Sequence, residues 1–318
     1  MTPAAVLVAA ASVAAAAGCA RRASPPPPPP GPIGSALLAL AGELGTPPSE
    51  VAAAWVRAAE IAGRVAERRR QDGGDLAAAL DAVVFGDLGF AREIEDPDLR
   101  FLTLPGVIES RRGGCLGLGA LYLVLAELLG APLEGVLVPG HFFVRVPGPP
   151  SRNLEMLRRG EVMPDTWYQN KYGPWPQGPS SAYGRAVSVA ELVAIHWFNA
   201  GNLGRRTGDL AGAGRGFARA AAGFPAFAEA QASLGAVLQL QGRLAEAESA
   251  YRAAARARSD LPGLADNLAW LVAERVGSAP PTKLQTKLQT NVQTKDPVAA
   301  TVQETVEKRK PLAVPSIQ

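Results

Sequence analysis

The strongest constraint on the fold is an internal repeat of 34 residues toward the C-terminal end of the sequence. Residues 194–227 align with residues 228–261, and the shared positions are glycine, alanine or aromatic. Small residues let two helices approach closely, and one large side chain per repeat fills the gap to the next helix. The repeat therefore predicts stacked helix pairs. The matched positions are Gly201 with Gly235, Gly208 with Gly242, Ala213 with Ala247, Phe217 with Tyr251, and Ala220 with Ala254.

This spacing resembles that of tetratricopeptide repeats, and a third first-helix follows in register at residues 263–276. We expect residues 187–276 to form a short all-α array. Its concave face would suit a peptide or a partner helix, or the array would only support the domain before it. His196 lies on a predicted helix of this array, and we interpret it as a packing or surface histidine. The tail, residues 277–318, contains a tetrapeptide repeat with few apolar residues and is expected to be disordered.

The N-terminal end has the features of an export signal. Residues 4–18 form an apolar segment too short to cross a membrane comfortably, and it ends in small residues. The end of this segment resembles a bacterial lipobox, which implies that Cys19 carries a lipid. An ordinary secretory signal cut nearby is the alternative. Residues 1–19 are thus predicted to be a signal peptide with a lipobox, and residues 20–34 a proline-rich linker in the extended polyproline II form.

Composition excludes several classes of function. The 32 Lys and Arg residues balance 29 Asp and Glu residues, and they form no aromatic-interleaved basic stripe, so nucleic acid is not an expected partner. The chain has two cysteines and two histidines, too few for a zinc site of the usual spacing. We therefore expect no metal, no other cofactor, and contact with a membrane only through the lipid anchor. The expected location is the bacterial cell envelope, facing the periplasm, on either membrane.

The region from residue 35 to residue 186 is expected to be a single domain with a helical N-terminal part. Apolar spacing predicts three helices between residues 35 and 84, and the arginines at 68–70 are interpreted as a solvated helix end. Cys115 begins an apolar segment that predicts a buried helix to residue 129, and His141 lies in a predicted strand pair that turns at Pro139-Gly140. A helix N-terminus stabilises a thiolate, and an adjacent imidazole can carry its proton. A buried structural cysteine is the alternative.

The motifs RRGGC, LYL, LGAPLEGV and PGHFFVR occur in this order between residues 111 and 145. With LGF and DP before them, they resemble the bacterial transglutaminase-like proteins of the SirB-type core family, many of which carry tetratricopeptide repeats. The resemblance covers about residues 80 to 170. It implies an α+β, papain-like core in which a cysteine on a helix faces a histidine and an acid on adjacent strands. Cys115 matches the nucleophile and His141 the base.

The third member of such a triad is less clearly defined by the sequence. Glu155 follows His141 by 14 residues, a spacing that a hairpin can span, and it is the first choice for the group that orients the histidine. Asn153 and Asp165 remain open as alternatives. No glutamine lies just upstream of Cys115 to complete an oxyanion hole, which leaves the backbone amide of Cys115 for this role. Residues 167–187 are rich in aromatic residues, glycine and proline and are expected to form an irregular loop that covers the cleft or packs on the core.

The function implied is thiol-dependent amide hydrolysis or acyl transfer on protein or peptide substrates, with Cys115, His141 and Glu155 as the triad. The alternative is a non-catalytic envelope scaffold that binds a partner protein through the repeats and the degenerate core. The substrate, the partner of the repeats and the oligomeric state do not follow from the sequence.

Overall fold

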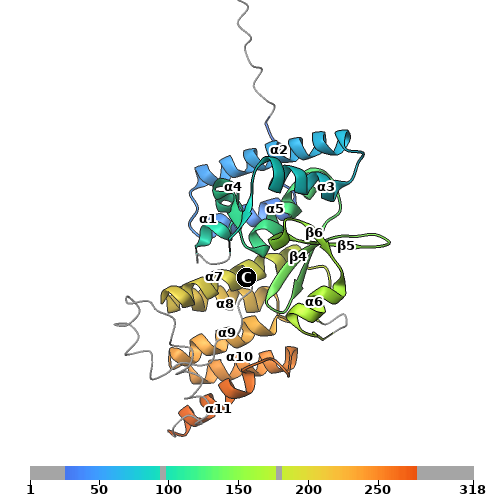
Figure 1. Ribbon diagram of the computed structural model, residues 1–318. Coiled ribbons are helices and arrows are strands. Elements are labelled where there is room, and N and C mark those ends of the chain that lie inside the picture. The colour runs from blue at the N-terminus through green and yellow to red at the C-terminus, as the bar shows by residue number, and fades with distance from the viewer. Residues whose placement is uncertain (1–25, 94–97, 177–180, 278–318) are drawn as a thin grey trace, which may run out of the picture.

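The computed structural model of the protein describes residues 26–93, 98–176 and 181–277. Over these ranges it has a mixed α/β architecture with small sheets and a helical C-terminal region (Figure 1). The predicted signal peptide with Cys19, the first part of the proline-rich linker and residues 278–318 lie outside the described residues. Among the described helices, none is both long and apolar enough to cross a membrane.

The helical N-terminal part consists of α1 (Pro32–Glu43), α2 (Pro48–Gln71) and α3 (Leu76–Asp81), and α3 continues into the π-helical turn η1 (Ala82–Asp87). The three helices expected between residues 35 and 84 are thus present. The first begins earlier than expected, because Pro32 is in its first turn, where proline is well tolerated. The Glu127 carboxylate accepts hydrogen bonds from the amides of Ile33 and Gly34, at 2.7 and 2.8 Å, and so caps this helix.

The proline-rich segment contacts the domain before α1 begins. The indole Nε1 of Trp55 donates a hydrogen bond to the Pro28 carbonyl at 2.7 Å. The Trp55 side chain is buried, and a buried indole needs an acceptor, which this carbonyl supplies. The expectation of a linker over the whole of residues 20–34 is therefore wrong for its last part: Pro28 is fixed on α2, and residues 32–34 are helical.

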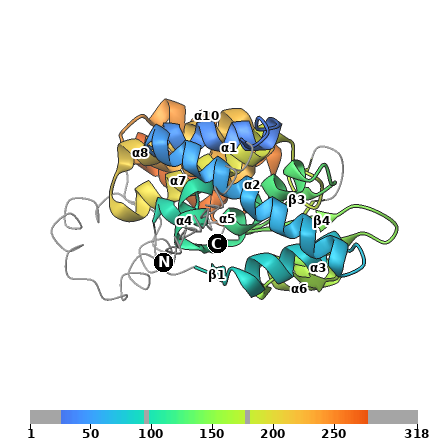
Figure 2. The ribbon, with the colours of Figure 1, turned by 90° about the horizontal axis from the view of Figure 1, so that it is seen from above.

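The centre of the domain is α5 (Cys115–Leu128), whose first twelve residues are all buried. The helix expected at 115–129 is confirmed to within one residue. Helices α1, α2 and α4 (Leu104–Ser110) pack on it together with strands β3 and β4 (Figures 1 and 2). Gly119 is required here, because a Cβ atom at this position would lie 2.9 Å from the Phe142 ring. Burial on all sides explains why this helix is uniformly apolar rather than amphipathic.

The main sheet is an antiparallel meander of β3 (Glu134–Val138), β4 (His141–Val146), β5 (Arg152–Glu155) and β6 (Glu161–Met163). The predicted strand pair is present and turns at Pro139-Gly140, where Gly140 has a φ of 71°. A short 3₁₀ turn, η3 (Met156–Arg158), joins the last two strands. The chain between α3 and α5 adds a 3₁₀ turn, η2 (Leu99–Phe101), and a parallel pair formed by β1 (Ala91–Arg92) and β2 (Arg112–Gly113).

The irregular loop expected at residues 167–187 is wrong for its first six residues. They belong to α6 (Asp165–Tyr172), which follows β6 directly. The Tyr168 ring is buried and stacks on the Phe143 ring of β4 with centroids 4.0 Å apart. Tertiary packing of one aromatic residue thus stabilises a short helix that has no apolar periodicity of its own.

The C-terminal helices are α7 (Val189–Thr207), α8 (Leu210–Gly223), α9 (Ala228–Leu240), α10 (Leu244–Ala257) and α11 (Leu264–Arg275). Two aligned glycines lie against the two aligned aromatic residues. A Cβ atom at Gly201 would lie 2.7 Å from the Phe217 ring, and one at Gly235 would lie 2.7 Å from the Tyr251 ring. The main hydrophobic core extends from α1 through the sheet to α7 and α8, whereas much of α9, α10 and α11 forms a second, smaller core. The boundary expected near residue 187 therefore does not separate the two cores.

Candidate functional site

Cys115 is the first residue of α5, and its side chain is fully buried. Gly114 occupies the N-cap position, and no side chain caps this end of the helix. The first backbone amides of a helix have no acceptor within it, and they add a positive partial charge at its N-terminus. The thiol is therefore at a position where a negative charge on sulfur is stabilised.

His141 and Glu155 come from neighbouring strands of the sheet. His141 begins β4, Glu155 ends β5, and the two strands pair antiparallel with Val144 opposite Leu154. The His141 Nε2 and Glu155 Oε2 atoms are 2.7 Å apart, and both side chains are 1% exposed. The second carboxylate oxygen of Glu155 accepts a hydrogen bond from the Leu157 amide at 3.0 Å, which fixes its orientation.

His141 also interacts with Cys115, so the structure brings all three residues together. Nε2 is committed to Glu155, while Nδ1 is buried and makes no regular hydrogen bond to a described residue; it is the ring nitrogen left for the sulfur. Burial lowers the pKa of His141, but the charge and hydrogen-bonding of Cys115, together with those of Glu155, outweigh it and raise this pKa to about 9. The surroundings of His141 therefore favour the protonated imidazole.

Asn153 and Asp165, the two alternatives to Glu155, belong to a separate hydrogen-bond network. The Asn153 amide nitrogen donates to Asp165 Oδ1 at 2.7 Å, and its carbonyl oxygen accepts from Arg145 Nε at 2.8 Å. The Arg145 guanidinium also pairs with Asp165 at 3.2 Å. This network ties the N-terminal end of α6 to β4 and β5, and neither alternative contacts His141 through a hydrogen bond found in the structure.

Aromatic side chains of α6 cover the histidine. The sequence predicted that this segment covers the cleft or packs on the core, but it did not predict the contact with His141. The Tyr172 ring stacks on the His141 ring with centroids 4.4 Å apart and planes 5° apart. Burial raises the pKa of Tyr172, and the charges of Glu155 and Cys115 add to this rise. Burial and the nearby Glu155 carboxylate also raise the pKa of Tyr168. The only sequence signal was the density of aromatic residues between 167 and 175.

His196, the second histidine, has no part in this group. It is buried in α7, and its Nδ1 donates to the Leu192 carbonyl at 2.8 Å. Complete burial lowers its pKa to about 4, so it is neutral under ordinary conditions. This environment agrees with the interpretation of His196 as a packing residue.

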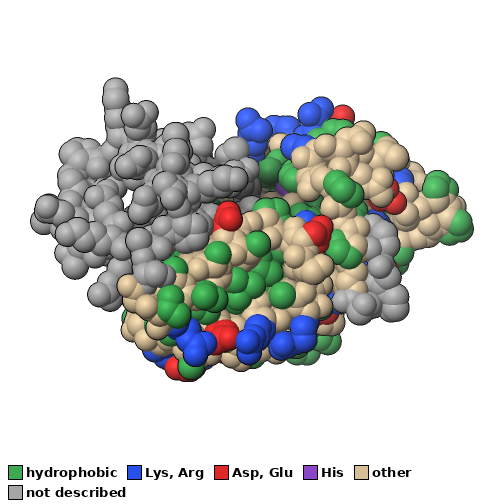
Figure 3. All heavy atoms as spheres, turned by 90° about the horizontal axis from the view of Figure 1, so that it is seen from below, with side chains coloured by type: hydrophobic (Ala, Val, Ile, Leu, Met, Phe, Trp, Pro, Cys, Tyr) green, Lys and Arg blue, Asp and Glu red, His purple; other side chains and the backbone are tan. Residues whose placement is uncertain are grey.

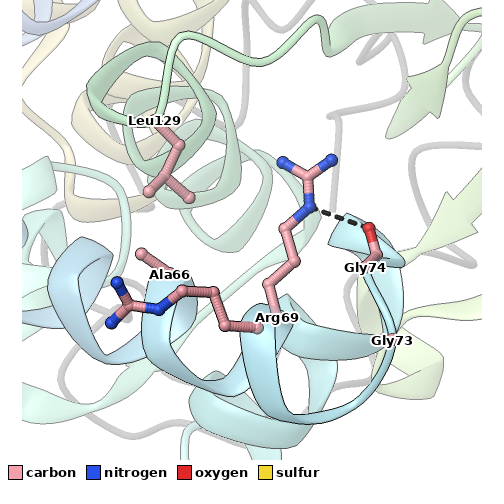
Figure 4. A pocket seen from close by; sticks show the side chains of 6 residues that line it. Ala66, Arg69, Gly73, Gly74 and Leu129 are labelled. Carbon is pink, nitrogen blue, oxygen red and sulfur yellow. Dashed lines mark hydrogen bonds between the residues drawn. The ribbon is translucent and has the colours of Figure 1, made fainter.

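A pocket of about 500 Å³ lies elsewhere, at the C-terminal end of α2 (Figure 4). Ala66, Arg69, Arg70, Gly73, Gly74 and Leu129 line it, and Arg69 Nε donates to the Gly74 carbonyl at 2.8 Å. Its other arginine, Arg70, forms an ion pair with Glu67, as expected for a solvated helix end. No member of the Cys115 group borders this pocket. Within residues 26–93, 98–176 and 181–277, no cluster of three or more Cys, His, Asp or Glu residues could hold a metal ion.

Comparison with known proteins finds a similarity over the region that contains these residues. The family model "Transglutaminase-like superfamily" matches residues 54–170, which include Cys115, His141 and Glu155. Two proteins named UPF0162 protein, from Xylella fastidiosa strains Temecula1 and 9a5c, are each 38% identical over 73 residues. The match spans 22% of this chain and 25% of each relative, and no solved structure matches significantly. The region that carries the three residues is therefore similar to the transglutaminase-like superfamily.

Proposed function

We propose that the protein is a thiol-dependent amide hydrolase or acyltransferase acting on protein or peptide carboxamides. The observation that carries this proposal is the contact of one histidine with both a cysteine at a helix N-terminus and a buried glutamate. Cysteine and imidazole in this arrangement form a nucleophile and its proton carrier, and the carboxylate fixes the ring. The similarity to the transglutaminase-like superfamily supports the same chemistry.

The proposed reaction proceeds through a thioester on Cys115. The thiolate attacks the carbonyl carbon of a carboxamide, and the resulting oxyanion is stabilised by backbone amides at the start of α5. The tetrahedral intermediate then breaks its C–N bond, and His141 donates its proton to the departing amine or ammonia. Water or a second amine next gives a proton to His141, attacks the thioester carbonyl and releases the thiolate together with an acid or a new amide. Glu155 keeps Nε2 protonated throughout, so that Nδ1 faces the sulfur.

The rest of the chain suits a protein that acts on other proteins in the cell envelope. In this proposal, α7 to α11 form a tetratricopeptide array, and Cys19 carries a lipid that holds the protein at the membrane. Val272 on α11 and Val276, which follows the helix, are 60% and 70% exposed. Figure 3, which looks from the α11 end, shows hydrophobic side chains gathered on this face beside a row of Lys and Arg. Such a face favours contact with a protein partner.

The burial of the three residues favours the rival function, a non-catalytic scaffold with an unreactive cysteine. Alkylation of Cys115 by iodoacetamide between pH 5 and pH 9, quantified by peptide mass spectrometry, separates the two. We expect His141→Ala to slow alkylation at pH 7 by about tenfold or more, because the cation beside the sulfur is lost. His196→Gln is the matched control and should leave the rate unchanged. If His141→Ala left the alkylation rate unchanged, the proposed enzymatic function would be excluded.

The lipid anchor is tested separately by membrane fractionation of cells. We expect Cys19→Ser to move the protein from the membrane fraction to the soluble fraction, since the acylated residue is lost. Cys115→Ser is the control and should stay in the membrane fraction. Membrane retention of Cys19→Ser would contradict the anchor and leave the proposal for the active site standing.

A further inference from the structure

The proposed nucleophile is covered in this structure. Cys115, His141 and Glu155 have exposed fractions of 0%, 1% and 1%, so a carboxamide cannot reach the sulfur while the surrounding side chains keep these positions. The proposed function therefore requires that one of the covering groups move aside. The question is which of them is placed to do so.

Of the two tyrosines of α6 that stack on His141, Tyr172 lies nearer. Its ring lies parallel to the imidazole of His141 at 4.4 Å, and the charges of both Cys115 and Glu155 act on its hydroxyl. Tyr168 lies farther from His141, at 6.1 Å, and is fully buried against Phe143, so it belongs to the core. Tyr172, by contrast, is only half-buried.

The two ends of α6 are held very differently. Its N-terminal end is fixed by Asp165, which binds Asn153 and Arg145, and by the buried ring of Tyr168. Its last residue is Tyr172, and Gly173 follows with φ of 83° and ψ of 165°, a conformation open essentially only to glycine. The contacts found for the Tyr172 ring are with His141, Trp167, Tyr168 and the ammonium of Lys171. The ring can therefore swing away while the rest of α6 stays in place.

We propose that Tyr172 is a specificity-determining residue whose ring forms the movable cover of Cys115 and limits the size of the groups that reach the sulfur. The proposal rests on the proposed function for its biological meaning, since a cover matters only where the thiol reacts. Substrate would enter on the side of His141 that the Tyr172 ring now occupies. An extended peptide or a side-chain carboxamide is narrow enough to use this opening, and a bulky folded surface is not.

The test compares two thiol reagents of different size on the full-length protein. Cys115 labelling is measured by mass spectrometry with iodoacetamide and with fluorescein-5-maleimide, in wild type, Tyr172→Ala, Tyr172→Phe and Asn170→Ala. We expect Tyr172→Ala to raise the rate with the large reagent by about tenfold or more, and the rate with iodoacetamide by less. Tyr172→Phe keeps the ring and should label like wild type. Asn170→Ala alters an exposed residue of the same helix end and should also label like wild type.

Three results would overturn the proposal: an unchanged ratio of the two rates in Tyr172→Ala, a Tyr172→Phe variant that behaves like Tyr172→Ala, or equal acceleration of both reagents to the rate of the unfolded protein. None of these depends on His141. If His141→Ala leaves alkylation unchanged while Tyr172→Ala admits the large reagent, the proposal for Tyr172 is supported and the proposed enzymatic function is excluded. If His141→Ala slows alkylation while Tyr172→Ala does not admit the large reagent, the enzymatic function is supported and Tyr172 is not the cover.

Discussion

Replacement of Glu155 by glutamine is expected to lower the rate of amide turnover by about 10²- to 10⁴-fold, the scale seen when the acid of a catalytic triad becomes an amide. The glutamine carbonyl would keep the hydrogen bond from the Leu157 amide, so its NH₂ group would face Nε2 of His141. A donor at that position makes Nε2 an acceptor and moves the ring proton to Nδ1, on the side of the sulfur. The imidazole then cannot accept the thiol proton.

The measurement uses a glutamine-containing peptide with a labelled primary amine, and it follows both ammonia release and amine incorporation. Glu161→Gln is the matched control, because Glu161 is exposed on the next strand and pairs with Arg158. This control should be as active as wild type. Turnover by Glu155→Gln within about threefold of wild type would show that the carboxylate does not orient the base.

The contact between His141 and Glu155 also makes the stability of the folded protein depend on pH. The pKa of His141 is about 9 in the folded protein and 6.5 as its ordinary value, so the folded state binds the proton more tightly. Its contribution to stability is complete below pH 6.5 and is lost as the pH rises through 9. His196 has the opposite effect on stability. Its pKa in the folded protein is about 4, below the ordinary value of 6.5, so the folded state loses stability as the pH falls from 6.5 toward 4.

The largest effect on stability is expected from Tyr251→Ala, at about 3–5 kcal/mol in the free energy of unfolding. The Tyr251 ring is fully buried on Gly235, and a substitution to alanine leaves a cavity between α9 and α10. Tyr251→Phe loses only the hydrogen bond to Gln239, at about 1 kcal/mol. Urea unfolding followed by circular dichroism measures both values.

The exposed neighbour Arg252 provides the control for this substitution. Arg252→Ala removes one surface ion pair with Glu248, which is worth less than about 0.5 kcal/mol. Tyr251 belongs to the smaller core, so hydrogen exchange should show the loss of protection in α9, α10 and α11 before the larger core. A loss below about 1 kcal/mol for Tyr251→Ala would mean that the aromatic position of the repeat does not hold the helices together.

The sequence predicted those features of the structure that depend on patterns within a short stretch of the chain. Cys115 at a helix start, His141 in a strand and the turn between β3 and β4 followed from apolar periodicity and one Pro-Gly pair, both of which span only about a dozen residues. Asn153 and Glu155 lie on the same face of β5, so the choice between them needed the register of β4 and β5, which places Asn153 opposite Arg145 and Glu155 nearer to His141. The sequence alone could only rank these two residues.

The features that the sequence missed depend on contacts between distant segments. Helix α6 is stabilised by the stacking of Tyr168 on Phe143, which lies 25 residues earlier in the chain. No local sequence pattern therefore predicts this helix. The same is true of Tyr172, which acts on His141 across a similar separation. Pro28 looked like part of a free spacer because its acceptor role is set by Trp55, 27 residues later.

The contact between Pro28 and Trp55 also limits the length of the segment that links the folded domain to Cys19. Pro28 is the ninth residue after Cys19, and a fully extended chain of that length reaches no more than about 32 Å. With Cys19 acylated as proposed, Pro28 and the Trp55 indole bound to its carbonyl stay within about that distance of the membrane surface, roughly one thickness of the bilayer's hydrocarbon core. This tether would limit how far the protein reaches from the membrane. Its substrates or partners would then be proteins embedded in, or lying directly on, the same membrane.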